Sequence, residues 1–76
     1  MELQDFINNF AAQFEETAAD VFMANTEFKK LAEWSSLMAL SIIAIVDEEY
    51  EVAIKGDDIR NSQTIEDLYN IVKSKK

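Results

Sequence analysis

Two adjacent serines are the residues with the clearest potential for chemistry. Ser35 and Ser36 stand directly before an almost unbroken apolar run from Leu37 to Val46. A serine hydroxyl is a poor nucleophile unless a neighbouring base takes its proton. The chain has no histidine and no cysteine, which excludes nucleophile–histidine pairs and the common zinc sites. We therefore predict no enzymatic activity, no catalytic residue and no metal site, and we expect Ser36 to be modified by another protein.

The serine pair also has a purely structural interpretation. A serine ahead of an apolar helix commonly caps it, because its side chain accepts hydrogen bonds from the unpaired amides of the first turn. The same amides, together with the positive end of the helix dipole, favour an attached phosphate. The local sequence leaves both possibilities open.

A cluster of acids lies at the other end of the same stretch. It consists of Asp47, Glu48, Glu49 and Glu51. Acids in the last turn of a helix face the negative end of its dipole, at a cost of roughly 0.3–1 kcal/mol each. A solvated charge cluster and a partner-binding surface explain them equally well. The acids lack the spacing of a calcium-binding loop, so they predict no ion.

Helices must position these residues. The chain has no proline and one glycine, Gly56, so little in it opposes helix formation. We predict an all-α four-helix bundle with helices from Glu2 to about Thr17, from Ser35 or Ser36 to about Glu51, from Gly56 through Ile59, and from Thr64 onward. The first connection is long and the third helix is short.

Helical periodicity supports this assignment. The expected first helix has one apolar stripe, formed by Leu3, Phe6, Ile7, Phe10 and Phe14. The fourth has a stripe of its own, formed by Ile65, Leu68, Ile71 and Val72. It opens on a capping box at Thr64 and Asp67 and ends in lysines that suit the negative end of its dipole. The second helix is apolar on more than one face, which predicts a central position or an apolar strip left for a ligand or partner.

The segment from residue 18 to residue 35 holds no single helical period. Its apolar residues are Val21, Phe22, Met23, Phe28, Leu31 and Trp34. We predict a long, partly ordered crossover that these residues anchor to the bundle. Thr26 is expected to cap a short turn leading to Lys29 and Lys30, which we interpret as a solvated pair.

Length and charge restrict the classes of partner. The 76 residues make one domain, residues 1–76, and the net charge of −8 disfavours nucleic acid and favours basic protein surfaces. The apolar run is shorter than the roughly 20 residues that span a bilayer. The N-terminus lacks the pattern of a signal peptide. We expect a cytoplasmic monomer that does not enter a membrane.

The stretch from Phe28 to Tyr50 resembles the acyl carrier proteins, whose hallmark is Asp-Ser-Leu at the start of the second helix. Here that region reads Glu-Trp-Ser-Ser-Leu, ending at Leu37. Phe28 lies eight residues before Ser36, as an aromatic commonly does in that family. The acids begin at Asp47, 11 residues after Ser36. The passage from Ile59 into Thr64 is similar to the family's entry into its last helix.

This resemblance implies a fold of acyl-carrier type and a phosphopantetheine arm on Ser36. A phosphopantetheinyl transferase would install the arm from coenzyme A with magnesium, and its thiol would hold acyl groups as thioesters. Acyl-transferring and acyl-elongating enzymes with basic docking surfaces would be the partners. The resemblance implies partner-binding residues on the second helix, namely Leu37, Met38, Asp47, Glu48 and Glu49. It also suggests that Leu37, Leu40 and Ile43 form the wall of an acyl cavity. Ordinary core packing is the alternative explanation for these three residues.

Two departures from the family pattern qualify the prediction. Ser35 replaces the usual aspartate, which makes Ser35 a less favoured alternative attachment point. The start of the second helix lacks the extra acids of general fatty acid carriers, which suggests a specialised fatty acid, polyketide or polysaccharide-acylation pathway. The rival hypothesis is an acidic helical adaptor, a degenerate carrier that binds a basic protein without a prosthetic group.

Overall fold

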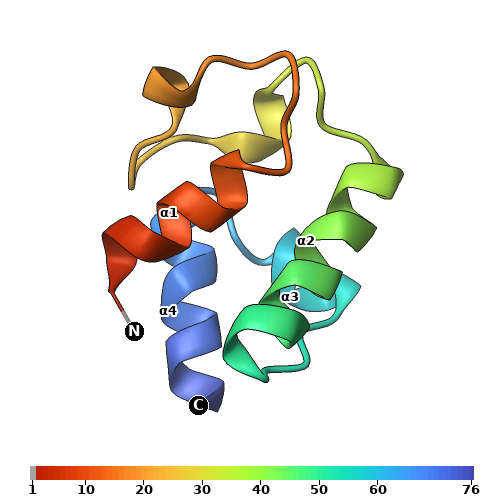
Figure 1. Cartoon of the computed structure of the whole chain (residues 1–76). Coiled ribbons are helices and arrows are strands. Elements are labelled where there is room, and N and C mark those ends of the chain that lie inside the picture. Colours follow the sequence, from red (N-terminus) through yellow and green to blue (C-terminus); the bar gives the residue numbers. More distant parts are fainter. Residues whose placement is uncertain (1) are drawn as a thin grey trace.

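Helices form every regular element in residues 2–76, the part of the chain that the computed structural model describes. The order is α1 (Leu3–Ala11), η1 (Ala19–Val21), η2 (Phe28–Lys30), α2 (Ser36–Tyr50), α3 (Gly56–Arg60) and α4 (Ile65–Lys75), where η marks a short 3₁₀ turn. In Figure 1, α1 crosses α4 at the left of the molecule, and α2 lies with α3 at the right. The connection from α1 to α2 runs across the top of this view. The all-α prediction, with its long first connection and short third helix, is confirmed. Across residues 2–76, no helix combines the length and apolar character that crossing a membrane requires.

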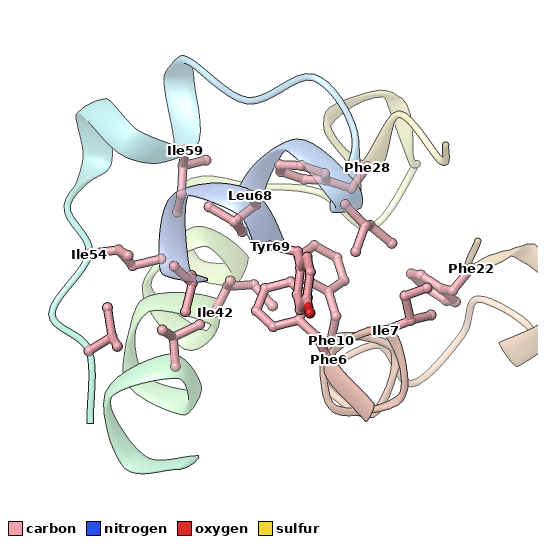
Figure 2. Close-up of a cluster of buried hydrophobic side chains, with 14 of the residues drawn as sticks. Phe6, Ile7, Phe10, Phe22, Phe28, Ile42, Ile54, Ile59, Leu68 and Tyr69 are labelled. Carbon is pink, nitrogen blue, oxygen red and sulfur yellow. The ribbon is translucent and has the colours of Figure 1, made fainter. Parts of the chain in front are cut away.

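Aromatic side chains form a continuous network through the core. It includes all five phenylalanines, both tyrosines and the one tryptophan. Phe10 of α1 meets Phe28 edge-on at 5.1 Å between ring centres, and Phe28 meets Trp34 at 4.9 Å. Figure 2 places Phe6, Phe10 and Tyr69 together where α1 faces α4. The predicted stripes of the first and fourth helices supply much of this buried surface.

The first helix ends at Ala11, so the prediction that it continues to about Thr17 is wrong. The amides of Glu15 and Glu16 donate to the carboxylate of Glu33, at 3.3 and 3.0 Å. The hydroxyl of Thr17 donates to the same carboxylate at 2.5 Å. Because these amides bond to a distant side chain, they cannot extend the helix, and a tertiary contact overrides good local propensity.

The crossover, predicted over residues 18–35 and observed over residues 12–35, is anchored to the bundle by only part of the predicted set, because Val21 and Met23 are 43% and 58% exposed. Phe22, Phe28 and Trp34 insert their rings into the aromatic network. Main-chain carbonyls of the crossover also accept hydrogen bonds from the first amides of α4, at 2.9 Å from Glu66 and 3.2 Å from Ile65. The crossover therefore satisfies amides that a helix N-terminus leaves unpaired.

Thr26 stabilises the turn before it, which corrects the prediction that it caps the turn leading to Lys29. Its hydroxyl accepts from the amide of Met23 and donates to the carbonyl of Val21, both at 2.8 Å. The residue at the cap position of η2 is Glu27, which makes no side-chain capping bond.

The ends of α2 and α4 are closed by specific contacts. The predicted capping box of α4 is present, with Thr64 and Asp67 exchanging side-chain and backbone hydrogen bonds. At the C-terminus of α2, Glu51 adopts a left-handed conformation with φ of 56°, which strains any residue with a side chain. Lys76 donates to the carbonyl of Tyr50 at 3.1 Å. A cation from the end of the chain thus lies at the negative end of the α2 dipole.

Candidate functional site

The two serines have different roles at the start of α2. Ser35 is the N-cap, and its hydroxyl accepts a hydrogen bond from the amide of Met38 at 3.2 Å. Ser36 is the first residue of the helix and is exposed, and its hydroxyl has no hydrogen-bond partner among the described residues. The sequence did not decide which serine caps the helix, and the structure shows that it is Ser35. The hydroxyl of Ser36 is accessible to another molecule.

An open groove begins beside Ser36, and we call it the Ser36 groove. It lies between α2, α3 and the crossover and has a volume of about 540 Å³. Leu40 and Ile43 line it from α2, and Ile59 lines it from α3. Trp34 contributes an aromatic wall from the crossover. The groove offers apolar contact to a chain that starts at Ser36.

The three residues predicted as acyl-cavity walls are only partly brought together. Leu40 and Ile43 line the Ser36 groove, whereas Leu37 lies outside its lining and is 75% exposed. Between α1 and α2, beside Phe6 and Tyr50, the interior has a void of about 10 Å³, which is close to the space of one water molecule. The open groove, and not this void, has room for an acyl chain.

The Ser36 groove also has two basic residues, Lys29 and Arg60. The ammonium of Lys29 donates to the carbonyl of Arg60 at 3.0 Å, which brings both residues to the C-terminus of α3. Lys29 is half-buried, so the predicted solvated pair is wrong for this lysine. Lys30 does face solvent and pairs with Glu27 at 2.8 Å.

The predicted partner-binding residues lie on two sides of α2. A helix turns by about 100° per residue, so Leu37 and Glu48, eleven positions apart, share one side. Asp47 flanks that side and is exposed. Met38 and Glu49 lie about 100° or more around the helix, and Met38 is half-buried. The exposed side is apolar near Ser36 and acidic at the other end.

Sequence reasoning missed several residues of the groove. Trp34 was expected only as an anchor, Lys29 as a solvated residue, and no role was predicted for Ile59 or Arg60. These residues come together only when the crossover and α3 pack beside α2. No local sequence pattern predicts that these residues lie together. The one tryptophan, two residues before Ser36, was the only sequence feature that indicated an aromatic wall near that serine.

Comparisons with known proteins do not assign a family to this arrangement. No family model, curated protein or solved structure matches the chain. The resemblance of residues 28–50 to acyl carrier proteins therefore stays a prediction from the sequence.

Proposed function

We propose that the protein is an acyl carrier protein whose phosphopantetheine arm is attached to Ser36. The observation that supports this most is the division of roles between the serines. Ser35 caps α2, which leaves the Ser36 hydroxyl exposed and unbonded at the rim of an apolar groove. A buried or hydrogen-bonded hydroxyl at that position would oppose modification.

The local environment of Ser36 suits a phosphodiester. It is the first residue of a 15-residue helix, where unpaired amides and the helix dipole favour negative charge. In the transfer, a bond forms between the Ser36 oxygen and phosphorus of coenzyme A, the pyrophosphate bond breaks, and adenosine bisphosphate leaves. The base that takes the hydroxyl proton belongs to the transferase, since the chain has no histidine.

The Ser36 groove suits the rest of the arm and its cargo. The groove measures about 540 Å³, against about 10 Å³ for the void beside Phe6, so it has room for a chain of many atoms. The apolar part of its walls, which includes Trp34, Ile43 and Ile59, would shield methylene groups from water. The arm supplies a thiol that this cysteine-free chain lacks, and acyl groups would be held there as thioesters.

The proposed partners are a phosphopantetheinyl transferase and acyl-transferring or acyl-elongating enzymes with basic docking surfaces. The net charge of −8 and the exposed acids of α2 support this choice, because opposite charges speed encounter and orient the partners. The site of action would be the cytoplasm, where coenzyme A and the transferase meet, in a specialised acylation pathway.

Incubation with coenzyme A, magnesium and a broad-specificity transferase tests the proposal. Intact-mass measurement should show the gain of one phosphopantetheine group per chain. A protein that gains no mass with any transferase tried would contradict the proposal, provided that a known carrier is loaded in parallel.

An acidic adaptor without a prosthetic group is the alternative function. The exposed side of α2, with Leu37 and Leu40 75% and 62% exposed, favours it, because that surface needs no modification to bind a partner. The same mass measurement separates the two, since an adaptor stays unmodified.

A further inference from the structure

We propose that the acyl chain carried by this protein bears a carboxylate at its far end, and that Lys29 and Arg60 bind this carboxylate in the Ser36 groove. The inference rests on the proposed function and names the class of cargo for the same site. It concerns two residues to which the sequence pattern gave no ligand-binding role.

The charge of the groove differs from that of the molecule. The chain has 15 acidic and seven basic residues, yet both ionisable residues that line the Ser36 groove are bases. A fully apolar cargo would gain nothing from them, because its methylene groups need only the walls formed by Trp34, Ile43 and Ile59. Two bases beside an apolar surface complement a chain that is apolar along its length and anionic at its tip.

Both bases have donors left for a ligand. The ammonium of Lys29 has three N–H donors, and one of them bonds to the carbonyl of Arg60. The guanidinium of Arg60 has five N–H donors in a planar fork that matches a carboxylate. Its contact is with Asp57, one helical turn away, and the two side chains are 73% and 74% exposed. An ion pair so exposed to water contributes little, so Arg60 can turn to a second carboxylate at small cost.

The competing anion is the phosphodiester of the arm itself. It would be fixed at the Ser36 oxygen, where the amides at the start of α2 already favour it. The volume of the groove exceeds what a phosphate fills, and the bases extend its lining to η2 and the end of α3. We therefore assign the bases to the cargo, and the test separates the two anions.

The experiment compares four forms of the protein: unmodified, loaded with the arm alone, loaded with an octanoyl arm, and loaded with a suberoyl arm of equal length that ends in a carboxylate. Thermal unfolding measures stabilisation by each cargo. The emission of Trp34, the one tryptophan, reports occupation of the groove that it lines. We expect the suberoyl form to melt roughly 2–4 °C above the octanoyl form and the emission of Trp34 to differ between them.

Lys29→Met and Arg60→Met should each reduce this difference, and the double variant should abolish it. Lys30→Met is the matched control, because Lys30 adjoins Lys29 in sequence but does not line the groove. The difference between two cargoes is taken within each variant, so that any effect of the substitution on the fold itself cancels.

Equal melting temperatures for the octanoyl and suberoyl forms of the wild type would overturn the inference. So would a difference that persists in the double variant. Stabilisation by the arm alone that disappears in the double variant would assign the bases to the phosphodiester, and would also overturn it. A chain that cannot be loaded at all would instead refute the proposed function, and this inference with it.

Discussion

At the scale of single residues, one hydrogen bond distinguishes two neighbouring serines. The amide of Met38 bonds to Ser35, so Ser35 is needed for helix stability and Ser36 is not. Both serines were visible in the sequence as possible caps, and the resemblance favoured Ser36 as the attachment point. The structure shows that capping and attachment do not require the same serine, because Ser35 caps α2 and the hydroxyl of Ser36 is exposed.

Replacing Ser35 by the aspartate usual in acyl carrier proteins should speed loading of Ser36. Aspartate caps a helix as well as serine does, so Ser35→Asp should keep the fold. Its charge would also attract a basic transferase. The measurement is the initial rate of phosphopantetheine transfer, followed by intact mass. An unchanged or slower rate would show that Ser35 does not limit modification.

Ser35→Ala serves as the control for this comparison. It removes the cap and should lower the free energy of unfolding by about 1 kcal/mol. Its circular-dichroism spectrum should stay helical at room temperature, so any loss of loading rate can be separated from unfolding.

At the scale of elements, every helix boundary predicted from the sequence lies within one residue of the observed one, except the end of α1. The starts of α2 and α4 are set by caps within a few residues, and both were placed correctly from the sequence. After α1 ends in tighter turns at Gln13 and Phe14, residues 15–17 are bonded to Glu33, which lies more than twenty residues beyond Ala11 in the chain. No periodicity in residues 2–17 contains that information, so the helix was predicted too long.

The carboxylate of Glu33 should make the crossover sensitive to acid. The hydroxyl of Thr17, followed by the amides of Glu16 and Glu15, holds the pKa of Glu33 below its usual value. A carboxyl group with a lowered pKa adds stability above its unfolded pKa of about 4.3, and this contribution is lost as the pH falls through the folded pKa.

Glu33→Gln should therefore lower the melting temperature at neutral pH, and the gap to the wild type should close as the pH falls below about 4. Thermal unfolding monitored by the emission of neighbouring Trp34 measures the gap. Glu15→Gln is the control, because its side chain is exposed in the same segment. A gap that stays constant from neutral to acid pH would contradict this role of Glu33.

At the scale of the whole molecule, the Ser36 groove and its two basic residues arise from the packing of separate segments of the chain. The all-α class followed from composition, and the core stripes followed from periodicity. The Ser36 groove joins residues of three segments, with Lys29 and Arg60 separated by 31 positions in the chain. Such a surface depends on how α3 and the crossover pack beside α2, which a single sequence does not encode in any local pattern.

The acidic side of α2 should determine how the whole protein meets its partners. Asp47→Asn and Glu48→Gln should each raise the KM of the transferase for this protein roughly two- to five-fold at low salt, because exposed charge pairs contribute modestly. The effect should shrink at high salt, where charges are screened. Glu49→Gln is the matched control, because Glu49 lies about 100° or more around the helix from Leu37, and it should change KM less. Equal effects of all three substitutions would indicate net charge rather than a defined docking side.

The central claim is that the Ser36 hydroxyl is the tether. It is tested most directly by loading the wild type, Ser36→Ala and Ser35→Ala with the same transferase and measuring intact mass, with fragmentation to locate the added group. We expect one phosphopantetheine on the wild type and on Ser35→Ala, located at Ser36, and none on Ser36→Ala. Modification of Ser36→Ala, together with its loss in Ser35→Ala, would contradict the account.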